Sequence, residues 1–320
     1  MPQATSPTTF TVTGVTSGVI LPCPPNRLTV ISVRWIVPGM GERAVIRQSA
    51  YGWLLVLCLC LVSSASAQGP IKDPQLEAVI KAVLKIKQID KPQVEEADLK
   101  SIFILDARNK GIKDLSGLEK CPNLVEVKLN GNEIVSLSPL AECKNLQSLY
   151  LSSNQVSDLN PLAGLVKLQH LELEKNQLVS LTGLQSLENL RSLYISDNQI
   201  TSLEPLAGLK KLTSLLADNN QITDLSPVQA QRWLSTLRLR GNKVTDLAPL
   251  THLNELRYTF LEGNPLQDLA PLIAMAQKDI AGEQRFAPYW RLYLDAEKLP
   301  EPAKAQVAEL AKLGVRVNPQ

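Results

Sequence analysis

Residues 168–178 read LQHLELEKNQL, and this pattern recurs seven times between Leu124 and Leu272 at a spacing of 22 residues. Each copy has an asparagine at its ninth position and apolar side chains at its first, fourth and sixth, except that the last copy has Thr259 at the fourth. The asparagines at this position are Asn132, Asn154, Asn176, Asn198, Asn220, Asn242 and Asn264. Because the central apolar residues alternate with period two, we predict a short strand in each copy that turns at the asparagine.

No single copy can bury its apolar side chains alone, so the copies must stack. The pattern L-x-x-L-x-L-x-x-N-x-[IVL] is that of a leucine-rich repeat, and it predicts an α/β solenoid: a right-handed superhelix with one parallel, concave sheet. Later in each copy, two apolar residues lie three positions apart, and a proline often precedes the second of them. This spacing predicts short 3₁₀ turns on the convex side. An asparagine side chain has donors and an acceptor, so we expect these asparagines to form a structural ladder that bridges neighbouring coils.

The charge is nearly balanced, with 33 basic and 31 acidic side chains. Residues 1–67 hold four arginines and one glutamate, so the remainder carries 29 basic and 30 acidic side chains, a net charge of −1. This balance argues against nucleic acid as a partner.

The first 67 residues differ from the rest in composition. Residues 1–39 contain no acidic residue and no usable periodicity, so they are either a disordered leader or a mis-called start upstream of Met40. Residues 40–67 combine arginines, an apolar run of ten and a small-residue end at Ala67, which is the arrangement of a secretory signal peptide. We therefore expect a secreted, periplasmic or cell-envelope protein that contacts the membrane only transiently. The rival, a membrane anchor, would need about 20 apolar residues.

The two ends of the array differ from its middle. Residues 71–101 predict a helical N-terminal cap in which Asp73 is the N-cap residue. The repeats then run over 102–275, and Lys110 replaces the asparagine in a degenerate first copy. An insertion follows Leu272, and residues 276–320 predict an irregular last repeat, with Tyr289 in the first leucine position, and a βαβ-like C-terminal cap.

The order of these features is similar to that of the bacterial internalin-type leucine-rich-repeat proteins. The matching motifs are Asp73-Pro74-x-Leu76-Glu77-Ala78, Asp98-Leu99, Gly111-Ile112-x-Asp114-Leu115-x-Gly117-Leu118 and the repeated Asp-Leu-x-Pro-Leu. The resemblance covers about residues 71 to 275. It implies a curved solenoid, export, and binding of another macromolecule through the concave sheet.

Period-two alternation also predicts which strand residues point outward on the concave sheet. The candidate ligand-binding residues are Lys128, Tyr150, His170, Glu172, Tyr194, Leu216, Arg238, Tyr258, Phe260 and Tyr293. Aromatic residues and arginine are enriched at interface hot spots, so we expect a protein or peptide partner, with an acidic centre at Glu172 and Glu174 and a basic flank at Arg238 and Arg240. Strand propensity alone could also place aromatics there.

Other functions remain open at this stage. The same aromatics could stack on a cell-surface glycan, which would suit a structural or glycan-binding role in the cell envelope. An intracellular scaffold would follow if the apolar segment were not processed.

Catalysis and cofactor chemistry are not expected. Ser148, His170 and Ser192 are nominally a nucleophile and a base, but an open sheet provides neither oxyanion donors nor a water-excluding pocket. The aspartates of the repeats share their position with serines, which favours capping of the backbone over metal binding. We therefore predict no enzyme, no cofactor and no metal.

Three further residues occupy unusual positions. Cys121 and Cys143 lie one repeat apart in a leucine column, as two small buried hydrophobic residues or as a possible disulfide in an oxidising compartment. Trp233 stands where the previous copy has Lys211, either as an outer-face contact for a partner or as a cover for a core thinned by Gln231, and the cover is the favoured interpretation.

Overall fold

The structure is a computed structural model that describes residues 69–319. The predicted leader, 1–39, and the predicted signal peptide, 40–67, lie outside the described residues. Within 69–319, no helix has the length and apolar character needed to cross a membrane.

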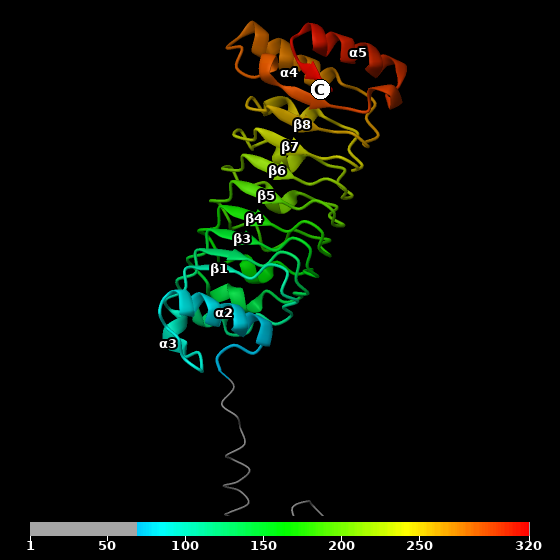
Figure 1. Cartoon of the computed structure of the whole chain (residues 1–320). Coiled ribbons are helices and arrows are strands. Elements are labelled where there is room, and N and C mark those ends of the chain that lie inside the picture. Colours follow the sequence, from blue (N-terminus) through cyan, green and yellow to red (C-terminus); the bar gives the residue numbers. More distant parts are fainter. Residues whose placement is uncertain (1–68, 320) are drawn as a thin grey trace, which may run out of the picture. The chain divides into compact units, whose positions relative to one another are not determined.

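One open sheet of ten parallel strands runs through the described residues, and each strand pairs with the next one in sequence (Figure 1). The strands are β1 (Ile104–Asp106), β2 (Glu126–Lys128), β3 (Ser148–Tyr150), β4 (His170–Glu172), β5 (Ser192–Tyr194), β6 (Ser214–Leu216), β7 (Thr236–Arg238), β8 (Tyr258–Phe260), β9 (Arg291–Tyr293) and β10 (Arg316–Val317). From β1 to β8 the paired residues are 22 apart, as in Leu149 with Leu171. This register confirms the predicted solenoid, because residues one period apart are physical neighbours.

Short 3₁₀ helices form the other side of most coils, as the proline positions predict. They are η1 (Leu118–Lys120), η2 (Ser138–Glu142), η3 (Asn160–Leu162), η4 (Glu204–Leu206), η5 (Ser226–Val228), η6 (Ala248–His252), η7 (Ala287–Tyr289) and η8 (Ala296–Lys298). The coil between β4 and β5 has Gly183 in place of proline and forms plain turns. Gly183 has φ +107°, and its N–H, which proline would lack, donates to Gln185 Oε1 at 2.7 Å.

The core is one continuous cluster of apolar side chains between the sheet and these turns. Its central strand residues, such as Leu171 and Leu193, are fully buried, and each buried leucine contributes about 1.5–3 kcal/mol. Thr259 is a polar residue at the same inward position. Its hydroxyl accepts a hydrogen bond from Trp290 Nε1 at 2.8 Å, so the buried polar groups satisfy each other.

The repeat asparagines lie in single file and join neighbouring coils. Asn176 shows the arrangement: its Oδ1 accepts from the Val156 N–H at 3.0 Å, while its Nδ2 donates to the carbonyls of Leu151 and Leu173, both at 3.0 Å. The other six, Asn132, Asn154, Asn198, Asn220, Asn242 and Asn264, make equivalent hydrogen bonds. Each side chain thus satisfies backbone groups that leave the sheet ladder where the strand ends.

Helices α2 (Pro74–Ile86) and α3 (Glu96–Leu99) precede β1. Asp73 begins α2 as the sequence predicts, with Oδ1 accepting from the N–H groups of Gln75 and Leu76 at 2.9 and 3.1 Å. Its Oδ2 accepts from the N–H groups of Lys113 and Asp114 at 2.9 and 3.2 Å, which ties the helix to the first coil. Burial alone would raise the pKa of Asp73, but these four hydrogen bonds hold the pKa below its usual value.

The other end of the stack holds α4 (Ala270–Ala281) and α5 (Glu301–Lys312), with α5 between β9 and β10 (Figure 1). The insertion after Leu272 is helix α4, which continues from the position of a 3₁₀ turn and buries Ile273 and Met275. The prediction that Tyr289 occupies the first leucine position of the last repeat is wrong. Tyr289 ends the turn η7 and is 56% exposed, while Trp290 is fully buried in its place.

Candidate interaction surface

The outward side chains at the first and third positions of β2 to β9 form one surface, which we call the sheet face. It contains all ten candidate residues, Lys128, Tyr150, His170, Glu172, Tyr194, Leu216, Arg238, Tyr258, Phe260 and Tyr293. Strand pairing places eight of them in one continuous row, in the order Lys128, Tyr150, Glu172, Tyr194, Leu216, Arg238, Phe260 and Tyr293. All ten are partly exposed, in contrast to the buried residues between them.

Three aromatic rings lie side by side on β3, β4 and β5. The His170 ring centroid is 4.9 Å from that of Tyr150 and 5.2 Å from that of Tyr194. His170 Nε2 lies 3.0 Å from Glu172 Oε1, and Asn130 Nδ2 donates to the other carboxylate oxygen of Glu172 at 3.4 Å. The imidazole that could have served as a catalytic base is therefore part of an aromatic row and contacts a carboxylate.

A third column of outward side chains follows the last position of each strand. Of its members, only Glu174 and Arg240 were predicted from the sequence. It contains Arg108, Asn130, Ser152, Glu174, Ser196, Asp218, Arg240 and Glu262. Its members lie two residues beyond the third strand position, so the period-two alternation continues for one step after the ladder ends. That continuation is the sequence signal by which the whole column could have been recognised.

Glu174 is the one carboxylate of this column for which residues 69–319 provide no hydrogen bond and no ion pair. Burial raises the pKa of Glu174, and the neighbouring Glu172 carboxylate raises it further. Burial also raises the pKa of Tyr194, followed by the charges of Glu172 and Glu174. The two carboxylates and the Tyr194 hydroxyl are therefore close enough to interact electrostatically.

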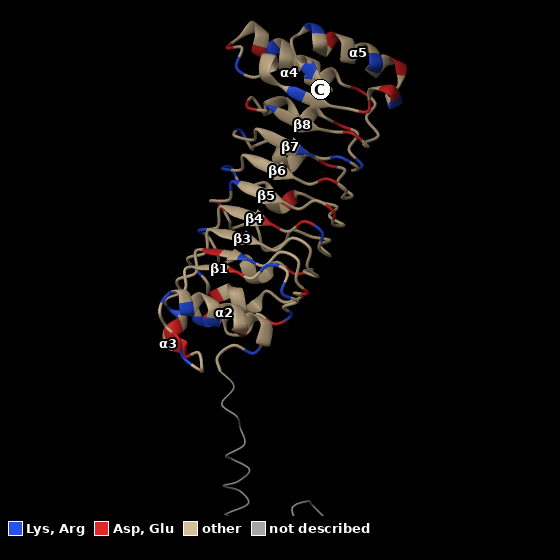
Figure 2. Ribbon diagram, viewed as in Figure 1, with Lys and Arg blue, Asp and Glu red and all other residues tan. Residues whose placement is uncertain are grey.

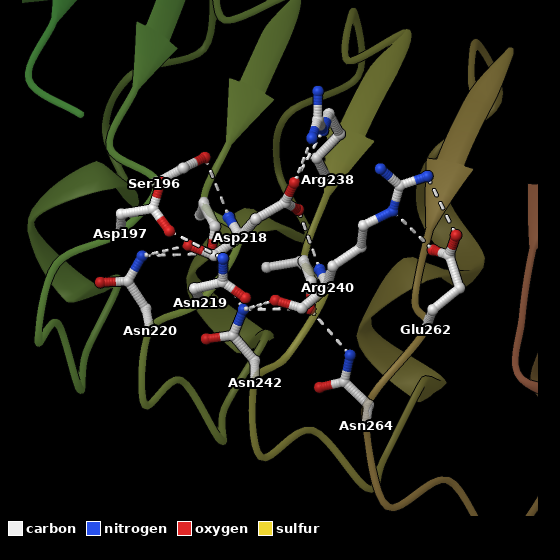
Figure 3. Close-up of polar contacts among 12 residues, drawn as sticks. Ser196, Asp197, Asp218, Asn219, Asn220, Arg238, Arg240, Asn242, Glu262 and Asn264 are labelled. Atoms are coloured by element: carbon white, nitrogen blue, oxygen red, sulfur yellow. Dashed lines mark hydrogen bonds and ion pairs between the residues drawn. The ribbon is translucent and has the colours of Figure 1, made fainter. Parts of the chain in front are cut away.

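The opposite half of the face carries a connected set of ion pairs (Figure 3). Asp218, only 5% exposed, pairs with the guanidinium of Arg238, whose Nε is 2.8 Å from Oδ2, and accepts from the Arg240 N–H at 2.9 Å. Arg240 pairs in turn with both oxygens of Glu262, at 3.0 and 2.9 Å. The predicted basic flank is therefore neutralised by two carboxylates of the chain itself.

Aromatic rings pack against the same two arginines. Phe260 and Tyr293 are stacked, with centroids 4.4 Å apart and planes 7° apart. The guanidinium carbon of Arg240 lies 4.4 Å from the Phe260 centroid, and that of Arg238 lies 5.5 Å from it. This half of the face thus contains a complete arrangement of carboxylate, cation and aromatic ring.

The remaining singled-out residues lie away from the sheet face. Cys121 and Cys143 are buried free thiols, and burial raises the pKa of each thiol to about 12. The prediction that Trp233 covers the core is wrong, because its side chain is 62% exposed. The core beneath is closed by Gln231 itself, which is fully buried and donates from Nε2 to the Leu206 carbonyl at 2.8 Å. Within 69–319, no group of three or more His, Cys, Asp or Glu side chains is placed to hold a metal ion.

Comparison with known proteins agrees with this architecture. The family described as leucine-rich repeats (2 copies) matches residues 144–186 and 188–230. The crystal structure of internalin C2 from Listeria monocytogenes has 36% sequence identity and a TM-score of 0.60, over 62% of this chain and 88% of that protein. A leucine-rich-repeat protein of Leptospira interrogans, at 23% identity, TM-score 0.62, and coverage of 73% of this chain and 68% of that one, shares the fold. No curated protein matches the sequence.

Proposed function

Because this chain belongs to the internalin family of bacterial leucine-rich-repeat proteins, we propose that it is an exported, non-enzymatic module that recognises a protein or peptide on its sheet face. Its leucine-rich-repeat fold is that of a protein-interaction module. The proposal adds the surface that binds, the class of partner and the export of the chain.

The observation that carries the proposal is the set of four aromatic side chains in one continuous row of the sheet face, with Glu172, Leu216 and Arg238 between them. Tyr150, Tyr194, Phe260 and Tyr293 lie on strands of one sheet and are all partly exposed. Exposed aromatic area next to arginine and carboxylate groups is typical of the centre of a protein interface. The rigid sheet holds these side chains in fixed positions, which lowers the entropy lost on binding.

Export is proposed from the sequence of residues 40–67, whose basic start, apolar run and small-residue end are those of a signal peptide. A mature chain would then begin near Gln68, directly before the described residues. N-terminal sequencing of the exported protein tests this expectation, and a start elsewhere would contradict it.

Glycan binding is supported less well than peptide binding. Stacking on a sugar requires a free ring face, but Phe260 lies between the Tyr293 ring and the Arg240 guanidinium. Tyr258, on the neighbouring column, has the Arg291 guanidinium 5.5 Å from its ring centroid. The chain's own side chains therefore occupy the rings that a sugar would use.

Affinity capture tests the proposal. The full-length chain is immobilised beside a variant carrying Tyr150→Ala, Tyr194→Ala and Phe260→Ala, and beside Trp233→Ala as a control that removes an exposed aromatic side chain outside the sheet face. We expect proteins that the unchanged chain and the Trp233 variant both retain and the triple variant loses. Equal recovery by all three would place the binding surface elsewhere, and recovery of polysaccharide in place of protein would favour the glycan role.

A further inference from the structure

We propose that Tyr150, Glu172, Glu174 and Tyr194 form a receptor site for a cationic side chain of the partner, an arginine in preference to a lysine. This inference rests on the proposed function, because it specifies the chemistry of the partner at one part of the sheet face. It names what the partner must present to β3, β4 and β5.

The first argument is the placement of the four side chains. Glu172 pairs in register with Tyr150 on one side and Tyr194 on the other, so the two phenol side chains flank its carboxylate. Neighbouring strands are about 4.8 Å apart, which separates the two tyrosines by about 10 Å. The His170 ring lies between them, with its centroid 4.9 Å from that of Tyr150 and 5.2 Å from that of Tyr194, so a ligand must approach from the other side of Glu172. Glu174 follows two residues after Glu172 on the same side of the coil, so both carboxylates border this approach.

The second argument is the uncompensated charge. Glu172 contacts only His170 and the Asn130 amide, and Glu174 has no partner within 69–319. The charges of Arg238 and Lys175 lower the pKa of Glu174, but neither side chain forms an ion pair with it. Lys128 Nζ is 2.6 Å from a carboxylate oxygen of Glu126, and Arg238 is paired with Asp218. In Figure 2 acidic residues accordingly mark the end of β4, whereas basic residues mark the end of β7.

The third argument is that the chain already shows the completed arrangement in its other half. There Glu262 holds Arg240, and the guanidinium of Arg240 lies against the Phe260 ring. The region around β4 has the carboxylates and the aromatic rings in equivalent columns, but no lysine or arginine of residues 69–319 is paired with Glu172 or Glu174. Lys128 Nζ lies 5.6 Å from the Tyr150 ring centroid and is paired with Glu126, which leaves the two carboxylates and the Tyr194 ring for a ligand. A partner arginine would supply it, since a guanidinium binds a carboxylate through two parallel hydrogen bonds and stacks on an aromatic face.

Titration of defined peptides tests the site directly. The full-length chain has six tyrosines, which can be labelled with ¹³C and assigned through Tyr→Phe variants. Acetyl-Gly-Arg-Gly-amide is expected to shift the Tyr150 and Tyr194 resonances with half-saturation on the order of 1 mM, and to leave Tyr258 and Tyr293 unchanged. Acetyl-Gly-Lys-Gly-amide should bind more weakly, and the norleucine and glutamate analogues should not bind.

Charge-neutralising variants identify the groups responsible. Glu172→Gln combined with Glu174→Gln should weaken binding of the arginine peptide by about tenfold or more, because both ionic partners are lost while the side-chain shape is kept. Glu188→Gln removes the same charge from an exposed turn outside the site and should change nothing. The proposal is overturned if the arginine peptide causes no shift at about 20 mM, or if the norleucine analogue or the double variant gives the same response as the unchanged pair.

The capture experiment separates this inference from the proposed function. If the Glu172→Gln, Glu174→Gln chain retains the same proteins as the unchanged chain while the triple aromatic variant loses them, the sheet face binds a partner and the cationic site is wrong. If both variants retain everything, the proposed function itself fails. Loss of the same proteins by both variants, together with the peptide shifts, supports both.

Discussion

The two halves of the sheet face share a backbone and differ in how their charges are used. Around β7 to β9, Asp218 and Glu262 are paired with Arg238 and Arg240, so the chain provides both partners of each contact. Around β3 to β5, Glu174 has no such partner within 69–319, and its pKa is raised by burial. The inward columns therefore determine the coil, whereas the outward columns either complete the chain's own contacts or leave them for a second molecule.

The largest expected effect tests whether the two halves share one scaffold. Asn176→Ala and Asn242→Ala each remove three or more hydrogen bonds to buried backbone groups, in the first and second half respectively. We expect each change to lower the free energy of unfolding by about 2–3 kcal/mol, measured by urea denaturation.

The exposed Gln199→Ala provides the control and should leave the midpoint unchanged. An unchanged midpoint for either asparagine variant, or a difference between the two larger than about 1 kcal/mol, would show that the halves do not share the same ladder.

The next effect tests whether the carboxylates of the two halves have different roles. Asp218→Ala leaves the partly buried Arg238 guanidinium without its anion and the Arg240 N–H without its acceptor. We expect a loss of about 2 kcal/mol, smaller than for a fully buried pair because Arg238 is partly exposed. Glu174→Ala, two repeats earlier in the same column and in the other half, should change stability by about 0.5 kcal/mol or less. Equal losses would contradict the distinction.

The smallest expected effect is the contribution of Glu174 to the pH dependence of stability. The pKa of Glu174 is raised in the fold, so the folded chain favours its protonated form, and the stabilisation present below the unfolded pKa of about 4.3 is lost as pH rises through the raised value. Glu174→Gln should therefore be more stable than the unchanged chain at pH 7, by about 0.5 kcal/mol, and equal to it near pH 4. Thermal denaturation at both pH values measures this.

The stability contributed by Asp73 should change with pH in the opposite direction in the same experiment. Its pKa is lowered in the fold, so its stabilisation is present above about pH 4 and is lost as pH falls below that value. Asp73→Asn should therefore destabilise the chain at pH 7 and not at low pH. A Glu174 variant that behaved in this way would show that Glu174 is a structural carboxylate.

The features that repeat could be predicted from the sequence. Leu171 and Asn176 each belong to a column of equivalent residues, and the constant spacing carries the register of the sheet from β1 to β8. The N-cap role of Asp73 followed from the proline after it. The outward position of the ten candidate residues followed from period-two alternation alone.

The features that occur once could not be predicted. The role of Asp218 depends on Arg238, 20 residues away, and on which of several charges in the third column meet. The exchange of Tyr289 for Trp290 at the core depends on a single turn after helix α4, where the period is interrupted. A residue with no equivalent one period away is placed by its packing partners, and the sequence pattern does not contain them.

The most direct test of the account uses one neutralised carboxylate from each half in the same titration with acetyl-Gly-Arg-Gly-amide. Glu174→Gln should weaken binding by about fivefold or more, because the open half supplies the anion for the ligand. Glu262→Gln should change it by less than about twofold, because Glu262 already serves Arg240. Equal losses, or a larger loss for Glu262→Gln, would contradict the central claim that the partner's cation binds where the chain's own charges are uncompensated.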